Sequence, residues 1–489
     1  MIGVWAYLLL AIGTTLFAVA ARWLFLRTRW WSLPIGLAMV FLWTLAGAWS
    51  FIGDAMSGFQ WYRIGLNYHY LMEKMFPFEL NGDYVLSLLA YFLFLAGLFV
   101  PMIILLKDGT AQRPAPQRTI TIDHRRAIFF GVAMIGLSVI MVMPIILQAI
   151  ADDVSFYLAV NDHSGRFASL RSFADQAAAF SIIFGYATYL VADRPGALFR
   201  GKKRGWLDLA FPILLAILGI YTALLGDRQI IFTFFLFSAM YLGVFTGLRG
   251  LRKGIAMIVI CVGAIFIGGW IRDFSWTEIK TAQRKERTSD KYYHFRLESI
   301  QHIPEKKGRI AQIGRFFFTN EMFAAHFSMY GVLHRNVPVE PAISLRYLAA
   351  SLRPSFIDPE RPSTSYEHYA MHARLTPGQG YTIHHASAWY INGGWPGIFF
   401  GGCLLGVIWA SLIRVSRKSN RWIPDHIPPL LPLLFVAFLP GMLRAGPEAY
   451  KMLLVEAFAL PILLLTIMRV RDRKTDTSLQ PNAKWAESN

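Results

Sequence analysis

Long apolar runs alternate with short polar connectors along the whole chain. Eleven of these runs approach the ~20 residues that a helix needs to cross the ~30 Å hydrocarbon core of a bilayer. The predicted spans cover residues 4–21, 31–52, 84–106, 127–149, 177–193, 207–225, 230–248, 254–271, 396–413, 427–442 and 451–468. The pattern therefore predicts an all-α polytopic membrane protein with about 11 transmembrane helices.

The connectors differ in charge in a way that predicts orientation. If the N-terminus lies outside, the inside segments carry 25 Lys and Arg against 8 Asp and Glu, and the short outside segments carry 7 against 11. Cytoplasmic loops collect Lys and Arg because positive charge resists translocation. We therefore expect the N-terminus outside and the C-terminus inside. The net charge of +18 then reflects topology, and we expect no nucleic-acid partner.

Two polar segments on the expected outer side divide the chain. Residues 1–271 hold predicted helices 1–8, with an aromatic, interfacial segment at 53–83. A large periplasmic loop at 272–395 follows, and loops of that length are usually functional. Residues 396–468 hold helices 9–11, and 469–489 form a cytoplasmic tail. Within the large loop, Phe316–Leu333 is expected to be a helix that is partly immersed and does not span.

Composition excludes several classes of protein. A hydrophobic content of 55% and a mean hydropathy of +0.42 are too high for a soluble globular protein. Cys261 and Cys403 both lie in apolar runs, so we interpret them as packing residues. The sequence contains no GxxxxGK[ST] phosphate-binding motif, so it does not indicate an ATPase.

Eight of the 12 histidines gather in the large loop. They are His294, His302, His326, His334, His368, His372, His384 and His385. His368 and His372 have the i, i+4 spacing of two metal ligands on one helix face. However, no third ligand is spaced to join them, and no HExxH occurs. We predict hydrogen-bonded or solvated histidines and no metal.

Three arginines stand at outer ends of predicted spans, against the charge bias of that side. Arg228 lies in the turn Gly226–Gln229, Arg272 follows the eighth span, and Arg444 lies between the last two spans. Such residues can reach lipid headgroups or pair with nearby acids. Alternatively, they converge to bind a diphosphate, which guanidinium groups recognise well.

Four short stretches resemble one known family. They are Leu352–Pro362 with its proline-basic-proline pattern, Ser387–Ile398 with its Tyr-Ile-Asn and glycine pair, the Gly226–Gln229 turn, and Leu443–Gly446. Together they are similar to bacterial oligosaccharide repeat unit polymerases, the O-antigen polymerases of the Wzy type. Two positions depart from that pattern, because Gly393 replaces an aromatic residue and Ala445 interrupts an Arg-Gly pair.

The resemblance implies a glycosyltransferase at the periplasmic face of the bacterial inner membrane. It would join undecaprenyl-diphosphate-linked oligosaccharides into O-antigen or exopolysaccharide, and the reaction would need no cofactor or metal. Membrane lipids would surround the enzyme. A chain-length regulator and a flippase of the same pathway are the partners to expect. His384 or His385, with Glu367 as the alternate, would be the base that activates the acceptor hydroxyl.

The remaining roles fall to arginines. Arg228, Arg272 and Arg444 would bind diphosphate, and Arg353, Arg361 and Arg374 would contact sugar or phosphate from the loop. The His384–His385 pair could equally be a hydrogen-bonded interfacial pair without chemistry. Aromatic loop residues could stack on sugars or form an interfacial belt.

Three other functions remain open. The neighbouring O-antigen ligases place a histidine about eleven residues before a Gly-x-x-Gly, whereas His384 and His385 lie ten and nine residues before Gly394. The polymerase pattern is the better fit. A lipid-linked oligosaccharide transporter would favour internal repeats and charged spans, but among the predicted spans Glu456 is exceptional in its charge. A scaffold for a synthesis complex is the third alternative.

Overall fold

The computed structural model describes eleven main segments of the chain. They are residues 2–30, 32–56, 80–107, 122–151, 168–192, 206–225, 229–244, 321–351, 361–375, 382–417 and 427–469, together with the single positions 252, 255 and 353. Most of the predicted interfacial segment, all of the predicted span 254–271 except position 255, and most of the tail lie outside the described residues. Arg228 and Arg272 lie outside them as well.

The described residues are almost entirely helical and contain no strand, only one isolated β-bridge. The helices are α1 (Ile2–Thr28), α2 (Ser32–Phe41), α3 (Gly47–Met56), α5 (Gly82–Leu106), α6 (His124–Ala151), α8 (Ala168–Ala179), α9 (Gly185–Ala192), α10 (Leu207–Leu225), α14 (Glu321–His334), α15 (Ile343–Ser351), α16 (Ser365–His372), α17 (His385–Val415), α18 (Leu431–Leu443), α19 (Tyr450–Met452) and α20 (Leu460–Met468). Short π- or 3₁₀-helical segments are η1 (Leu42–Ala46), η3 (Phe180–Phe184), η4 (Pro428–Leu430), η5 (Pro447–Ala449) and η6 (Leu453–Ala459).

Six helices in the described part of the chain are long and apolar enough to cross a membrane. They are Ile2–Thr28, Ser32–Trp49, Gly82–Leu106, His124–Leu147, His385–Val415 and Pro447–Met468, the last of which we call the last span. Shorter apolar helices cover Leu207–Thr222, Gln229–Val244 and Pro428–Leu443. The chain is therefore a helical, multi-pass membrane protein. The count of eleven spans and their orientation stay predictions.

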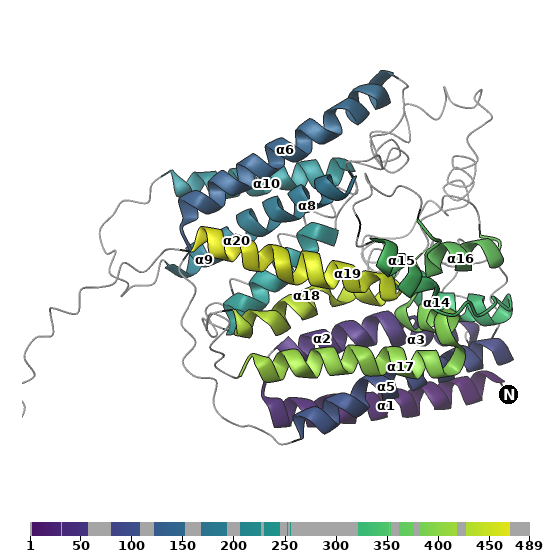
Figure 1. Cartoon of the computed structure of the whole chain (residues 1–489). Coiled ribbons are helices and arrows are strands. Elements are labelled where there is room, and N and C mark those ends of the chain that lie inside the picture. Colours follow the sequence, from purple (N-terminus) through teal and green to yellow (C-terminus); the bar gives the residue numbers. More distant parts are fainter. Residues whose placement is uncertain are drawn as a thin grey trace, which may run out of the picture.

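The loop helices α14, α15 and α16 gather at one end of the bundle, which we call the loop end (Figure 1). The start of α1 lies at this same end. At the opposite end, Ile122 pairs with Arg469 and the Asp123 amide donates to Met468 O at 2.8 Å.

Helices α5 and α17 pack with their backbones in close contact. A β-carbon at Gly97 would overlap Phe399 O, and β-carbons at Gly402 and Gly406 would overlap Phe94 O and Leu98 O. Glycines four residues apart allow such approach between membrane helices, where packing replaces the hydrophobic driving force. This close packing thus holds α17 in place and positions its residues at the loop end.

Helix α17 begins at His385, well before the predicted start of this span at 396. It is bent at Gly393 and Gly394, where the backbone leaves helical geometry. Gly394 has φ +61° and ψ −150°, a conformation that side-chain-bearing residues avoid. Pro396 follows and cannot donate a helical hydrogen bond. The bend separates the first two turns of α17, at the loop end, from the long apolar part.

Candidate functional site

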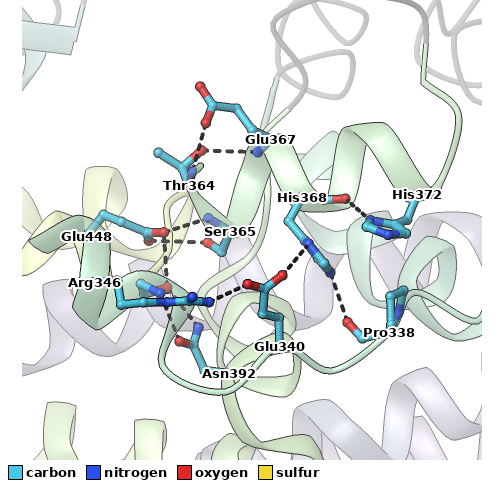
Figure 2. Close-up of polar contacts among 11 residues, drawn as sticks. Pro338, Glu340, Arg346, Thr364, Ser365, Glu367, His368, His372, Asn392 and Glu448 are labelled. Carbon is cyan, nitrogen blue, oxygen red and sulfur yellow. Dashed lines mark hydrogen bonds and ion pairs between the residues drawn. The ribbon is translucent and has the colours of Figure 1, made fainter. Parts of the chain in front are cut away.

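Glu448 joins the loop helices to the turn between α18 and the last span. Its Oε1 accepts from Ser344 Oγ at 3.0 Å and from the Ser365 amide at 2.7 Å, and its Oε2 accepts from Ser365 Oγ at 3.2 Å (Figure 2). Ser344 lies in the first turn of α15 and Ser365 in that of α16. Helix N-termini carry partial positive charge and unsatisfied amides, so they favour a carboxylate there. One half-buried carboxylate therefore clamps both helices.

Asn392 fixes α15 to α17 beside this clamp. Its Oδ1 accepts from the Ser344 amide at 3.0 Å, and its Nδ2 donates to Ser344 Oγ and to Ala388 O, both at 2.8 Å. Gly446 completes the arrangement, because a β-carbon there would overlap both Glu448 Oε2 and Ser365 Oγ. Parts of the two motif stretches Ser387–Ile398 and Leu443–Gly446 thus lie around one carboxylate.

A second polar group surrounds Glu340, which lies just before α15 (Figure 2). The Glu340 carboxylate contacts Arg346 on one oxygen and His368 Nδ1 on the other, the latter at 3.3 Å. His368 Nε2 lies 3.0 Å from Pro338 O. Both ring nitrogens of His368 thus face acceptors, and both contacts are hydrogen bonds only when the ring is an imidazolium. His372 Nδ1 in turn lies 2.9 Å from His368 O, where it donates.

Three further histidines are buried, His326 within α14 and His384 and His385 at the start of α17. The His326 ring lies 2.8 Å from Thr44 O through Nδ1 and 3.2 Å from Tyr84 OH through Nε2. His384 Nε2 lies 3.3 Å from Thr44 Oγ1, and its Nδ1 accepts from the Ala386 amide at 3.1 Å. His326 and His384 are at most 1% exposed. Because a carbonyl only accepts and an amide only donates, His326 carries its proton on Nδ1 and His384 on Nε2.

His385 is equally enclosed and is fully buried. Trp389 Nε1 donates to His385 Nε2 at 3.0 Å, and Tyr450 OH lies 3.2 Å from the same nitrogen. His385 Nδ1 lies 2.9 Å from Ala445 O and donates to it. An indole N–H can only donate, so His385 Nε2 is unprotonated and its lone pair is occupied. The ring therefore ties α17 to the turn after α18 as a neutral hydrogen-bonding group.

These geometries rank the three candidate bases. Every ring nitrogen of His384 and His385 has a protein partner, and neither ring reaches solvent in this structure. Glu367 is exposed, but it forms the capping box of α16, in which Oε2 accepts from the Thr364 amide at 2.8 Å. A catalytic base needs a lone pair that can reach the acceptor hydroxyl. Of the three, Glu367 meets that need best.

The described arginines take different positions at the loop end. Arg361 is half-buried, its Nη2 donates to Arg353 O at 3.0 Å, and its Nε is buried without a hydrogen-bond partner in the described part of the chain. Arg353 is exposed. Arg374 is exposed just after α16, with φ 54°. Arg444 is half-buried at the C-terminal end of α18. Within the described segments, Arg361 thus keeps an unused donor, as Arg171 does in α8.

Several residues of the site had little or no role in the sequence interpretation. Glu340 and Lys451 are polar residues in or beside segments expected outside, and neither belongs to a short motif. Asn392 entered only as part of the Tyr-Ile-Asn stretch, and Glu448 only as an acid near Arg444. Lys451 lies near enough to Arg361 and Glu456 for their charges to interact. Lys451 carried a signal that was not used, because it is a cation at the expected outer end of a span, as Arg444 is.

No metal site emerges from the part of the chain that the structure describes, since it contains no group of three His, Cys, Asp or Glu side chains placed to hold an ion. His368 and His372 pack ring against ring, with centroids 4.1 Å apart, and bond to the protein. Comparison of the chain with protein-family models, with curated proteins and with solved structures found no match.

Proposed function

We propose that this protein polymerises undecaprenyl-diphosphate-linked oligosaccharide repeat units at the periplasmic face of the inner membrane, with the loop end facing the periplasm. One observation carries the proposal: parts of all four stretches that resemble the polymerase family lie at or near the loop end. Asn392 contacts α15, Gly446 packs against Ser365, and Arg361 precedes Ser365 by four residues. These stretches are separate in sequence, and their described residues lie in different structural elements.

The fourth stretch joins the others through Gln229. A β-carbon at Gly441 would overlap Nε2 of Gln229, so the helix that follows the Gly226–Gln229 turn packs against α18 just before Arg444. Arg228 immediately precedes Gln229 in the sequence. In this proposal, Arg228 and Arg444 therefore serve one diphosphate, together with Arg361 from the loop. Arg272, Arg353 and Arg374 complete the cationic surroundings.

The proposed reaction is a glycosyl transfer. A hydroxyl of one lipid-linked repeat attacks the anomeric carbon of the growing chain, the bond from that carbon to the diphosphate oxygen breaks, and the diphosphate leaves with the electron pair. The hydroxyl proton passes to a carboxylate base, for which Glu367 is the exposed candidate. Diphosphate is a good leaving group, so its negative charge needs stabilisation by cations more than it needs an acid. His384 and His385 act by positioning α17.

The test is the surface glycan of a strain from which the gene has been deleted, examined by gel electrophoresis. Loss of a polymerase leaves single repeats on the final acceptor. Loss of a ligase leaves polymer on the lipid carrier, and loss of a transporter leaves neither product. A deletion strain with long chains of normal length distribution would refute the proposal. Complementation with Arg361→Ala and Arg444→Ala should restore the protein but not the long chains.

A further inference from the structure

Two cations lie together where the loop meets the last span. Arg361 comes from the loop just before α16, and Lys451 lies in α19, in the first turns of the last span. The Ser365 amide donates to Glu448 Oε1 at 2.7 Å, and Arg361 lies four residues before Ser365 while Lys451 lies three residues after Glu448. The two like charges are therefore near enough to repel each other. Both side chains are half-buried, so water screens them less than it would on an open surface. Like charges held together in this way favour binding of an anion between them.

The nearby acids leave this pair only partly neutralised. Glu456 attracts Lys451, but its Oε2 already accepts from Gln176 Nε2 at 2.5 Å. Glu448, three residues before Lys451, has both oxygens bound to Ser344 and Ser365. Arg361, Lys451 and Glu456 together carry one net positive charge.

Among the described residues, a buried donor without a partner belongs to Arg361 itself, and a buried acceptor without one belongs to Gln176, which donates to Glu456. Arg361 Nε–H is buried without an acceptor in the described part of the chain, and the guanidinium is oriented by its bond to Arg353 O. Buried donors almost always have partners, so such an atom indicates a ligand or water that completes it. Gln176, only 4% exposed, also keeps a buried Oε1 without a partner within those described segments. Gln176 is connected to Lys451 through Glu456.

We propose that Arg361 and Lys451 form an anion site for the phosphate or diphosphate group of a lipid. The π-helical segment η6, which follows α19, brings Glu456 onto α8 and so fixes the membrane side of the site. The lipid tail lies along the last span, and the phosphate lies between the ammonium and the guanidinium. The site deepens the proposed function if the lipid is polyprenyl diphosphate, but it rests on the two cations and not on glycosyl transfer.

Direct binding tests the site. The full-length protein in maltoside micelles, which contain no phosphate, is titrated with farnesyl diphosphate, inorganic diphosphate and phosphatidylglycerol, and the dissociation constants are measured. Arg361→Gln and Lys451→Gln should each weaken binding of the tightest probe roughly ten-fold or more, as expected for loss of a charge-assisted contact. Lys451→Arg should retain most of the affinity. Arg414→Gln, which removes an exposed cation at the opposite end of α17, is the matched control.

The three probes identify the source of the phosphate. Preference for farnesyl diphosphate assigns a polyprenyl lipid, preference for phosphatidylglycerol assigns a membrane phospholipid, and equal binding of inorganic diphosphate assigns the anion alone. Unchanged affinity for all probes in both Gln variants, with normally folded protein, would overturn the site. That result would also remove Arg361 from the diphosphate contacts of the proposed polymerase, but it would not refute glycosyl transfer, because no turnover is measured. A failed deletion test would refute the polymerase and leave this site untouched.

Discussion

Replacement of Glu448 should release α15 and α16 from the membrane helices. Glu448→Ala removes one carboxylate and leaves three donors without their acceptor, two on Ser365 and one on Ser344. Each such bond contributes about 1 kcal/mol net in a half-buried setting, so the docked loop should lose about 3 kcal/mol. That loss corresponds to a roughly 100-fold rise in the population of the undocked loop. Glu448→Gln keeps one acceptor oxygen and should lose less.

Hydrogen exchange followed by mass spectrometry measures this opening directly. In Glu448→Ala, amides of α15 and α16 should exchange roughly 100-fold faster, while those of α5 and the apolar part of α17 should not change. Gly446→Ala should produce the same local pattern, because the added β-carbon displaces the Glu448 carboxylate. The matched control is Glu367→Gln, which weakens only the capping box of α16. Unchanged exchange in both α15 and α16 of Glu448→Ala would refute the clamp.

Four further outcomes follow from the packing. Gly402→Leu should prevent the close contact of α5 and α17 and abolish the monodisperse peak in size-exclusion chromatography, whereas Gly82→Ala, which meets open space, should be neutral. Trp389→Phe removes the donor to His385 Nε2 and should lower the melting temperature by a few degrees, through loss of about 1 kcal/mol of stability. An unchanged melting temperature would show that this hydrogen bond does not stabilise the folded protein. Burial lowers the pKa of His326 from 6.5 to about 4, so the unfolded chain binds a proton between these values that the folded protein does not. Stability should therefore fall as pH decreases from about 6.5 to 4, and His326→Gln should flatten that part of a melting-temperature profile. Glu340→Gln should free His368 and Arg346 and raise proteolysis near α15, with no effect on α5; equal cleavage of both proteins would contradict this.

Hydropathy alone predicted most of the helices, because a bilayer imposes a length and polarity on each span that can be read locally. The apolar core of α5, for example, lies within the predicted span 84–106. The start of α17 was different. Its first turns carry His384, His385 and Asn392, which are polar in sequence, so the pattern placed the span at 396. Only contacts with Ala445, Thr44 and Ser344 make those residues compatible with a buried helix.

The candidate site was also predictable only in part from the sequence. The sequence by itself determined that the chain is a helical membrane protein and that most of its histidines lie in one long loop. It also led us to Arg361 and Arg444. The tertiary structure decided which polar groups meet. His384 contacts Thr44, 340 residues away in the sequence, and Ser365 donates to Glu448, 83 residues away. Burial of a polar group is tolerable only with a partner. Such partners come from distant segments, so no local pattern could reveal that the histidines are enclosed or that Glu448 is the clamp.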